Sequence, residues 1–422
     1  MLNIDELIKR LPPIYGWDRE LIERVSRLGP VELSRFQQES LVKPMRWARE
    51  LPIAYPGTRS FEEMPLLSKD DIRKNYGAYL RKGLWPVAKK QTSGTSGLSL
   101  ELRRSLPAVI FEWAMIDWVV AHTGHNYRTE RVAWFRTNDI KPMDDQEPPF
   151  WTWTASHILS FSVNHLNAQN LKHYLSELRS YRPEIIYSYP LTAEHFAKLV
   201  AAAGEKIHIP LVVCSSEGLP PRSRALIKEV LGAEVIDYYG QGERVSFAYS
   251  LEPGKFRFHP AYGFTELIPV EGDRGTDGQV YEIVGTSFHN SAQILIRYRT
   301  GDFIELPRDA SVQDVANGYA TFSGISGRLN EVIHTPGGER LVGLNFIPRG
   351  LERYGRMQMV QDAIDHVDIL LESPDGGSPA AAAEILAKAR LKVPTSVKLD
   401  IKFVKELQRT ATGKSPFILN RM

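Results

Sequence analysis

The sequence contains a single cysteine, Cys214, among its 422 residues. An intramolecular disulfide is therefore impossible, and a zinc site built from several cysteines is excluded as well. The sequence also lacks an uninterrupted apolar run of about 18 residues, the length that a membrane-spanning helix requires. Its most apolar stretch, from Phe111 to Val120, is broken by Glu112 and Asp117. We therefore expect neither a disulfide scaffold nor a transmembrane helix.

The sequence also carries little net charge. Its 52 Lys and Arg residues nearly balance 50 Asp and Glu residues, which leaves a formal charge of +2. Such a balance gives no general attraction to nucleic acids or to anionic membranes. The first residues include Asp5 and Glu6, where a secretion signal would carry basic residues and then an apolar run. We expect a cytoplasmic protein with no nucleic-acid partner.

Helices and strands alternate along the middle of the chain. Residues 1–90 have a mostly helical pattern, and between 130 and 240 short apolar strands alternate with helices. That alternation predicts a mostly parallel sheet covered by helices. The predicted strands are 131–135, 184–187, 211–214 and 234–238, and the predicted helices are 168–181, 191–203 and 221–231.

The pattern changes after residue 255. Residues 255–322 alternate like antiparallel strands with Gly and Asp turns, including a strand predicted at 292–298. Beyond residue 327 we predict a hairpin, a helix near 343–354, a strand at 366–371, a helix at 379–390 and a last strand at 398–404. The expected fold class is α/β, with a large N-terminal domain (1–327) that adds an antiparallel β subdomain to the parallel sheet. A small α+β C-terminal domain (328–422) follows.

A loop of glycines and hydroxyl-bearing residues follows the first helical region. The glycines let backbone N–H groups approach a ligand closely and the hydroxyls supply further donors, which suits polyphosphate oxygens. The loop is not of the Walker type, because no Lys-Ser or Lys-Thr pair follows it. An ordinary solvated loop is the alternative interpretation. Its residues are Thr92, Ser93, Gly94, Thr95, Ser96 and Gly97.

Glu243 comes shortly after an apolar strand that ends in Tyr239 and Gly240. This order places its carboxylate at the carboxyl end of a sheet strand, where α/β proteins bind ligands. A carboxylate in that position is suited to hold Mg²⁺ against ATP phosphates. The alternative is a capped turn with a surface glutamate.

Two more positions carry potential chemistry near the C-terminal half. Asp302 follows a strand and a glycine, which suits hydrogen bonds to both hydroxyls of a ribose, although a type I turn explains Thr-Gly-Asp equally well. Lys414 lies on a Gly-containing loop, as a mobile cation for a negatively charged reaction centre would. A solubilising charge is the alternative for this lysine.

The order of these motifs resembles that of the adenylate-forming superfamily of acyl-CoA synthetases, luciferases and peptide-synthetase adenylation domains. The succession is a Ser/Thr/Gly loop, Tyr-Gly-x-x-Glu, Tyr-Arg-Thr-Gly-Asp, Gly-Arg and Thr-x-x-Gly-Lys, and it covers nearly the whole chain. Within that superfamily the sequence is similar to the phenylacetate-CoA ligase-like branch, particularly to its capsular-polysaccharide-biosynthesis members. The stretches 66–69, 71–73, 181–183, 189–190 and 294–299 carry this similarity.

The resemblance implies an enzyme that uses ATP to convert an aryl or acyl carboxylic acid into its acyl-AMP with release of pyrophosphate. An acceptor then takes the acyl group, by family default the thiol of coenzyme A. The 92–97 loop would hold the β- and γ-phosphates, Glu243 would hold Mg²⁺, and Asp302 with Arg328 would bind the ribose. Lys414 would act from a mobile C-terminal lid and bridge the substrate carboxylate and the α-phosphate. The adenine pocket implied by the resemblance consists of Ser216, Glu217, Gly218, Tyr239 and Gly240.

The sequence departs from the family pattern in three places. Leu98 and Ser99 follow the loop where relatives carry a Lys-Pro pair in either order. Gly242 stands where a Thr or Ser usually precedes the glutamate, and residues 329–331 lack the usual hinge aspartate. These departures leave the second half-reaction open.

The acid-binding pocket is implied to lie in an aromatic-rich segment. The residues assigned to it are Trp134, Trp151, Trp153 and His157, with core packing as the alternative. His259 and His289 are expected to be structural.

Other functions compete with coenzyme A ligation. The acyl group is passed to an amine or hydroxyl of a sugar, or to a carrier protein, in one alternative, and AMP is transferred to the substrate itself in another. A nucleotide-binding module without activity is a third. The expected partners are a carboxylic acid, its acceptor and a second copy of the chain in a homodimer.

Overall fold

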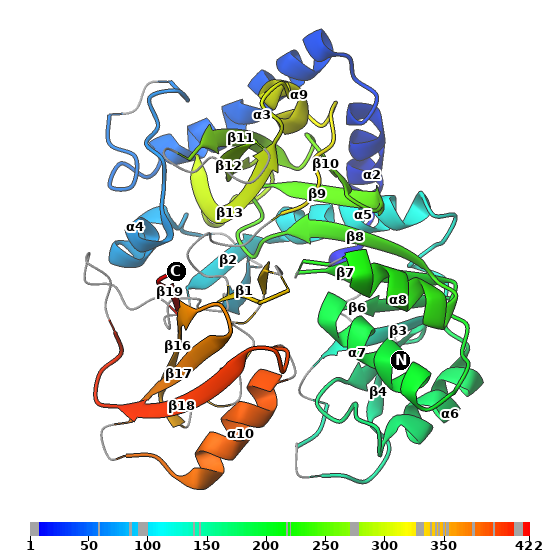
Figure 1. Ribbon diagram of the computed structural model, residues 1–422. Helices are drawn as coiled ribbons and strands as arrows, with labels where there is room; N and C mark the ends of the chain where they lie inside the picture. Colours follow the sequence, from blue (N-terminus) through cyan, green and yellow to red (C-terminus); the bar gives the residue numbers. More distant parts are fainter. Residues whose placement is uncertain are drawn as a thin grey trace. The chain divides into compact units, whose positions relative to one another are not determined.

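In the computed structural model of the chain, eight strands form one sheet with the order β10-β9-β8-β7-β6-β3-β5-β4 (Figure 1). Strands β5, β3, β6, β7 and β8 run parallel, and antiparallel strands extend both edges. The strands are β3 (Val132–Thr137), β4 (Trp151–Ala155), β5 (Ile158–Ser162), β6 (Ile185–Ser188), β7 (Leu211–Ser215), β8 (Glu234–Gly240), β9 (Phe247–Glu252) and β10 (Lys255–Phe258).

The structure describes residues 8–57, 60–83, 87–91, 100–137, 140–142, 145–216, 218–219, 221–270, 278–325, 333–337, 340–341, 344, 347–348, 351, 354–373, 376–390, 393–408 and 417–422. The chain divides into two compact units. The larger unit comprises residues 1–89, 103–300 and 304–324, and the smaller comprises 90–102, 301–303 and 325–422. The predicted domain boundary between residues 327 and 328 lies outside the described residues.

Helices cover both faces of the large sheet, as the unbroken apolar runs of its central strands require. Along β7, Leu211 and Val213 belong to the core that contains α5 (Leu106–Ala121), and α2 (Ile14–Val25) contributes to the same core. Val212 and Cys214 point the other way, into the core under the helices α6 (Leu171–Tyr181), α7 (Pro190–Ala202) and α8 (Pro221–Leu231). The predicted helix-covered parallel sheet is confirmed.

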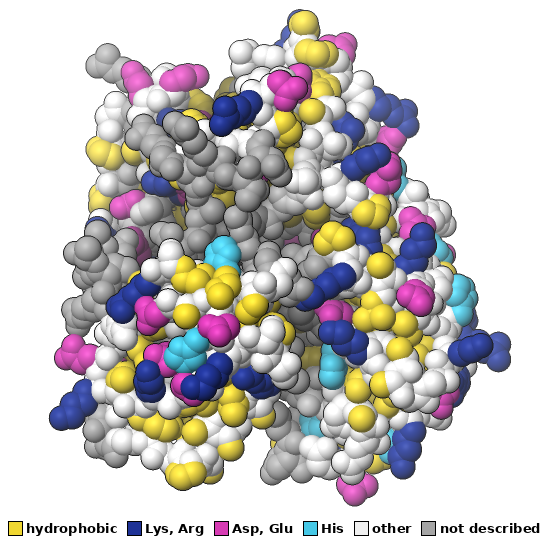
Figure 2. All heavy atoms as spheres, viewed as in Figure 1, with side chains coloured by type: hydrophobic (Ala, Val, Ile, Leu, Met, Phe, Trp, Pro, Cys, Tyr) yellow, Lys and Arg dark blue, Asp and Glu magenta, His cyan; other side chains and the backbone are white. Residues whose placement is uncertain are grey.

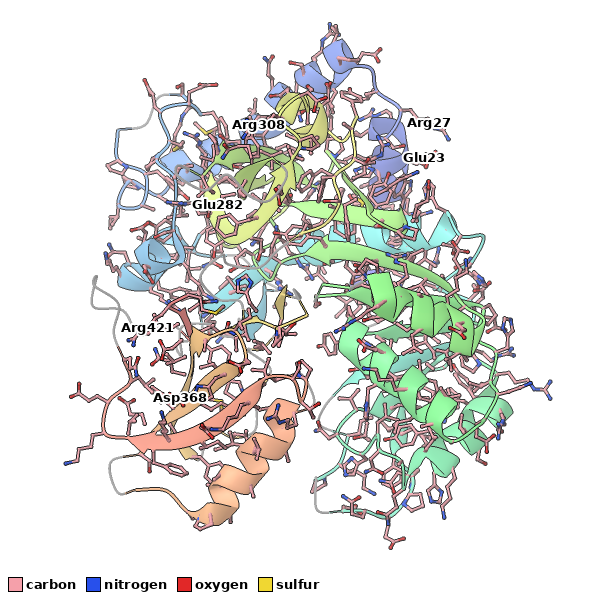
Figure 3. All side chains as sticks on the ribbon, viewed as in Figure 1. Glu23, Arg27, Glu282, Arg308, Asp368 and Arg421 are labelled. Atoms are coloured by element: carbon pink, nitrogen blue, oxygen red, sulfur yellow. The ribbon has the colours of Figure 1, made fainter. Side chains whose placement is uncertain are left out.

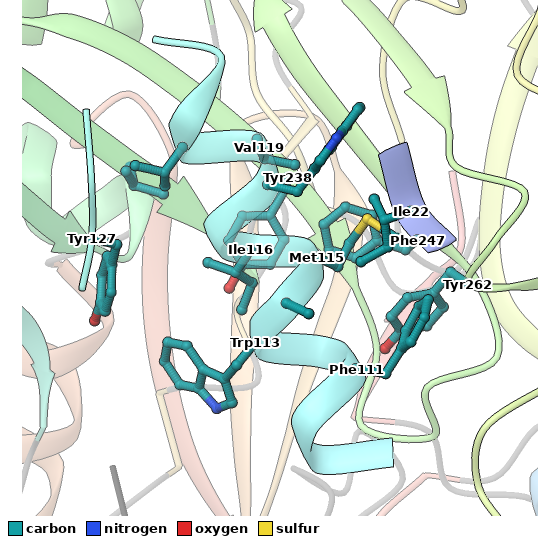
Figure 4. Close-up of a cluster of buried hydrophobic side chains, with 14 of the residues drawn as sticks. Ile22, Phe111, Trp113, Met115, Ile116, Val119, Tyr127, Tyr238, Phe247 and Tyr262 are labelled. Carbon is teal, nitrogen blue, oxygen red and sulfur yellow. The ribbon is translucent and has the colours of Figure 1, made fainter. Parts of the chain in front are cut away.

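Helix α5 lies inside the larger unit rather than on its surface. Figure 4 shows Ile22 from α2 and Phe247 from β9 on the same side of α5 and Tyr127 on the other side, with Tyr238 from β8 nearby. A helix that is apolar all round is stable only when it is buried on all sides. This placement explains why Glu112 and Asp117 need partners inside the protein.

The predicted antiparallel subdomain is confirmed for residues 263–306, but not every strand predicted between 255 and 322 belongs to it. It is a sheet of β11 (Gly263–Pro269), β12 (Gln279–Ser287) and β13 (Tyr298–Leu306) in the order β11-β12-β13. The strand predicted at 292–298 is not formed. The Tyr55 hydroxyl bonds the backbone at Ile294 (2.9 Å) and Ile296 (3.3 Å), and the Thr286 hydroxyl accepts the Arg297 N–H (2.8 Å). Side chains thus satisfy part of this backbone, and backbone bonds with Tyr79, Arg81 and Leu67 satisfy other groups of it.

The C-terminal unit has its own mixed sheet, in the order β18-β17-β16-β19. Helix α10 (Pro379–Arg390) connects β17 to the parallel strand β18, and both helix and strands contribute to one apolar core. The predicted helix at 379–390 and strand at 398–404 are confirmed, but β19 rather than β18 is the last strand. The strands are β14 (Ile333–His334), β15 (Arg340–Leu341), β16 (Arg356–Ala363), β17 (His366–Glu372), β18 (Lys398–Val404) and β19 (Ile418–Asn420).

Four helices and two short strands complete the described elements. They are the helices α3 (Pro30–Arg49), α4 (Lys69–Lys74), η1 (Tyr76–Tyr79) and α9 (Val312–Ala316), and the strands β1 (Val87–Gln91) and β2 (Glu101–Ser105). Ser68 caps the start of α4, since its hydroxyl accepts the Asp71 N–H at 3.2 Å. Most of the helix predicted near 343–354 lies outside the described residues.

Acidic and basic side chains are interspersed over the described part of the face in Figure 2, in keeping with the small net charge. None of the described helices has both the length and the apolar character needed to span a bilayer.

Candidate functional site

The carboxyl ends of β7 and β8 bring together three of the predicted adenine-pocket residues. Ser215 on β7 pairs in register with Tyr238 on β8, so the next residues, Ser216 and Tyr239, lie at the same edge of the sheet. Gly218 follows Ser216 on the same loop, and Glu217 lies outside the described residues. Ser216 has a φ of 74°, a left-handed backbone that is uncommon for a residue with a side chain. Such outliers are found often at ligand sites.

Gln241 orders the turn that follows β8. Its Nε2 donates to the Tyr239 hydroxyl (3.1 Å), and its Oε1 accepts the N–H groups of Val245 (3.3 Å) and Ser246 (3.4 Å). One side chain therefore links the half-buried Tyr239 ring to the backbone beyond the turn.

Glu243 lies half-buried in this turn, at the carboxyl edge where the sequence predicted it. The Tyr298 hydroxyl of β13 donates to its Oε1 at 2.8 Å. Among the described residues, no hydrogen bond or ion pair goes to the other oxygen, Oε2. A carboxylate with one oxygen anchored by a tyrosine fits Mg²⁺, which takes one or two protein carboxylates and otherwise water and phosphate oxygens.

A buried charged network surrounds the backbone on both sides of Glu243. Arg104 on β2 donates two hydrogen bonds to the Gly242 carbonyl, from Nε (3.0 Å) and Nη2 (2.6 Å). Arg244 donates from Nη1 to the Ala108 carbonyl of α5 (2.7 Å), and its Nε lies 3.7 Å from Glu112 Oε2. Tyr262 donates to the same Glu112 carboxylate.

The electrostatics of this network follow from its burial. Burial lowers the pKa of Arg104 to about 10, and the positive charge of Arg244 adds to the effect, while Glu112 and Glu243 oppose it. Burial and the Glu112 charge also raise the pKa of Tyr262 well above its ordinary value. The sequence predictions did not include Arg104, Arg244 or Tyr262. The only signal was Glu112 itself, a charge inside an otherwise apolar helix.

Asp302 lies half-buried within β13, so Thr300, Gly301 and Asp302 form strand rather than the type I turn that was the alternative. Gly301 has a φ of 72°, and the Thr300 hydroxyl donates to the Ile283 carbonyl at 2.7 Å. The residues of the 92–97 loop, Arg328 and Lys414 lie outside the described residues.

The four residues assigned to the acid-binding pocket do not share one face of the sheet. Trp134 on β3 packs with Tyr187 on the α5 side. Trp151 on β4 packs with Phe161 on the opposite side, and Trp153 stacks edge-on against Tyr181 at 5.4 Å while 59% exposed. His157 lies in the turn between β4 and β5. The structure therefore separates Trp134 from Trp151 and Trp153.

A second group of potential metal ligands lies on β17 and β18. His366 Nε2 is 2.9 Å from Asp400 and 3.6 Å from Asp368, which Figure 3 labels. Both carboxylates already face ammonium groups, with Lys402 at 2.6 Å from Asp368 and Lys398 at 2.8 Å from Asp400. Because these lysines already supply the positive charge that the carboxylates attract, we do not assign a metal site to this group.

Comparison with known proteins gives two relatives and no matching family model. Protein CapK of Staphylococcus aureus is 23% identical over 396 residues, which are 92% of this chain and 85% of CapK. The phenylacetate-coenzyme A ligase of Pseudomonas putida is 26% identical over 308 residues, 69% of this chain and 64% of that enzyme, so the chain spans less than two thirds of its length. These relatives confirm the predicted resemblance to the phenylacetate-CoA ligase-like branch.

Solved structures give more distant matches. A 2-hydroxyisobutyryl-CoA ligase in complex with R3-HIB-AMP is 16% identical, with 99% of this chain and 92% of that chain covered and a TM-score of 0.46. A likeness at this distance decides nothing about the substrate.

Proposed function

We propose that this chain, which resembles acid-activating ligases over most of its length, is an adenylate-forming ligase that converts an aryl or acyl carboxylic acid into its acyl-AMP. The position of Glu243 carries the proposal. Its carboxylate lies at the carboxyl edge of a parallel sheet, on the same edge as Ser216 and Tyr239. Ligands of open α/β sheets bind at this edge.

The proposed nucleotide site draws on motifs from several parts of the chain. Ser216, Glu217, Gly218 and Gly240 line the adenine pocket, and the Tyr239 ring, held by Gln241, stacks on the base. Asp302 and Arg328 bind the ribose hydroxyls, and the 92–97 loop holds the β- and γ-phosphates.

The chemical step joins the substrate carboxylate to the α-phosphorus. A C–O–P bond forms, the bond to the β-phosphate oxygen breaks, and pyrophosphate leaves. Two anions resist this approach, so catalysis needs positive charge and alignment. Lys414 supplies the charge between the carboxylate and the α-phosphate. Mg²⁺ held by Glu243 would neutralise the phosphate oxygens, and Tyr298 fixes the carboxylate that holds it.

The second step hands the acyl group to an acceptor, and coenzyme A is the acceptor proposed first. A sugar amine or hydroxyl, or a carrier-protein thiol, is an alternative for the acyl group, and AMP transfer to the substrate is an alternative reaction. Residues 328–422 act as the mobile lid that excludes water from the acyl-AMP. Incubating the enzyme with ATP, an acid and each acceptor in turn, and separating the products, distinguishes these outcomes.

Exchange of labelled pyrophosphate into ATP tests the first step. Exchange should depend on the acid, because only a reversible acyl-AMP returns label to ATP. Lys414→Ala should slow the exchange at least about a hundredfold, since it removes charge stabilisation in the transition state. ATP binding, measured by calorimetry, should change little.

Lys405→Ala is the matched control, because Lys405 is an exposed lysine of the same region without an assigned role. It should exchange at the wild-type rate. Absence of exchange over a broad panel of acids would contradict acid activation, and wild-type exchange by Lys414→Ala would remove Lys414 from the mechanism.

A further inference from the structure

The turn that carries Glu243 is held at three points, by Arg104 and Tyr298 from distant parts of the larger unit and by Arg244 of the turn itself. Arg104 grips the Gly242 carbonyl before the glutamate with two hydrogen bonds. Arg244, the residue after it, is tied to the Ala108 carbonyl, and Tyr298 holds the carboxylate itself.

The backbone of this turn needs such support. Gly242 has no side chain to restrict its φ and ψ angles. Arg244 adopts a φ of 57°, a left-handed conformation that a non-glycine residue keeps only when its surroundings enforce it. Without the Arg104 contact, the position of the Glu243 backbone would depend on a flexible glycine and a strained neighbour.

From this geometry we propose that Arg104 and Tyr298 are positioning residues for Glu243, Arg104 fixing the backbone of its turn and Tyr298 the orientation of its carboxylate. The inference deepens the proposed function and rests on it. Neither residue is assigned a contact with the reacting atoms. Both would fix the position of the carboxylate that would hold Mg²⁺, where small displacements cost much affinity.

The choice of arginine at position 104 also has an electrostatic consequence. Arg104 is 8% exposed and interacts with the charges of Arg244, Glu112 and Glu243. Arg104 thus has one arginine and two glutamates as its charged neighbours.

Metal-dependent nucleotide binding tests the proposal without turnover. The probe is α,β-methylene-ATP, which cannot form an acyl adenylate, titrated by calorimetry in MgCl₂ and in EDTA. The wild-type protein should bind it more tightly in MgCl₂. Arg104→Gln should reduce that gain about tenfold, and Tyr298→Phe about threefold or more, because each removes bonding to a charged or metal-directed group. Affinity in EDTA should stay within about twofold for both.

Arg257→Gln is the matched control. Arg257 donates to two backbone carbonyls, those of Gly318 (2.6 Å) and Tyr319 (3.0 Å), but it lies on edge strand β10, which β9 separates from β8. It should keep the wild-type gain. Thermal unfolding checks each variant, and if Arg104→Gln does not fold, Tyr298→Phe, which loses a single oxygen atom, carries the test.

The outcomes separate the two proposals. Folded variants that keep the full Mg²⁺-dependent gain overturn the positioning role and leave the ligase proposal standing. A wild-type protein that binds no nucleotide, or binds it equally in EDTA, overturns the metal role of Glu243 and the positioning role with it. Loss of the gain in Arg104→Gln but not in Arg257→Gln supports the inference.

Discussion

His259 shows what burial does to a single titratable side chain. It is 3% exposed and packs edge-on against Trp118 at 4.8 Å, with its Nδ1 accepting the Ala261 N–H at 3.3 Å. Burial lowers its pKa from 6.5 to about 3, with the nearby His122 charge as a second cause. His259 is therefore neutral in the folded protein at any pH near neutrality, which suits the structural role expected of it.

This shift predicts a pH dependence of stability. Between pH 6.5 and about 3 the unfolded chain binds a proton at His259 that the folded protein does not, so stability falls as the pH falls through this range. The contribution is about 2 kcal/mol between pH 7 and pH 5. His259→Phe should remove that part of the loss, as measured by urea unfolding at both pH values.

Substitution of an exposed histidine provides the comparison. His208→Phe should leave the difference between the two pH values as it is in the wild type. If His259→Phe loses as much stability on acidification as the wild type, the buried histidine is not a source of acid sensitivity.

Among the elements, α5 depends on a charged contact at its buried face. Asp117 is 6% exposed, and Arg10 donates to both of its oxygens, at 2.7 and 2.8 Å. The Tyr15 hydroxyl on α2 adds a third bond at 2.7 Å. A buried carboxylate of this kind is tolerated only while its partners are present.

Arg10→Met should therefore destabilise the protein by about 3–5 kcal/mol, because it leaves a buried charge without its cation. Replacing both partners, in Arg10→Met with Asp117→Leu, should recover most of that loss. Free energies of unfolding in urea measure both effects.

An exposed ion pair shows how much stability a surface contact contributes. Lys255 and Glu252 lie 2.7 Å apart with side chains 58% and 67% exposed, so Lys255→Met should cost at most about 1 kcal/mol. Equal losses in Arg10→Met and Lys255→Met would show that the Arg10 contact is worth no more than a surface pair.

Regular elements were the part of the fold that the sequence could predict. Helices α8 and α10 match their predicted bounds, because a proline begins each one and the apolar positions repeat at helical spacing. The hairpin of β4 and β5 was missed, since its turn at Ser156 and His157 lacks the Asn-Gly or Asp-Gly signal and its aromatic residues were assigned to a substrate pocket.

The candidate site also has a part that the sequence could predict and a part that it could not. The position of Glu243 at the sheet edge follows from a strand and the turn after it, which are local in sequence. Its supporting contacts join Arg104 to Gly242 across 138 positions and Tyr298 to Glu243 across 55. Nothing in one sequence specifies such pairings, because they depend on how the sheets pack.

For the whole molecule, separate apolar cores suggest separate unfolding. The core of the C-terminal unit draws on residues between Ile333 and Ile418, whereas the two cores of the larger unit draw on residues up to Tyr262. Ile369→Ala, at a fully buried position of β17, should destabilise its unit by about 2–5 kcal/mol through the cavity it creates.

Scanning calorimetry should then resolve two transitions that respond to different changes. Ile369→Ala should lower one transition by roughly 10 °C or more, and Val213→Ala, at a fully buried position of β7, should lower the other. A single transition that shifts with both changes would show that the two units unfold together.

The common direction of β6, β7 and β8 also gives the two rims of the large sheet different freedom to change during evolution. Loops at the carboxyl ends hold Ser216 and Glu243, which we propose to bind the nucleotide and the metal, so we expect mutations there to alter chemistry. Loops at the amino ends, such as the exposed segment around Gly204, lie at the opposite rim. Insertions and drift in those loops alter only stability, and a new substrate can therefore evolve at one rim while the other continues to support the fold.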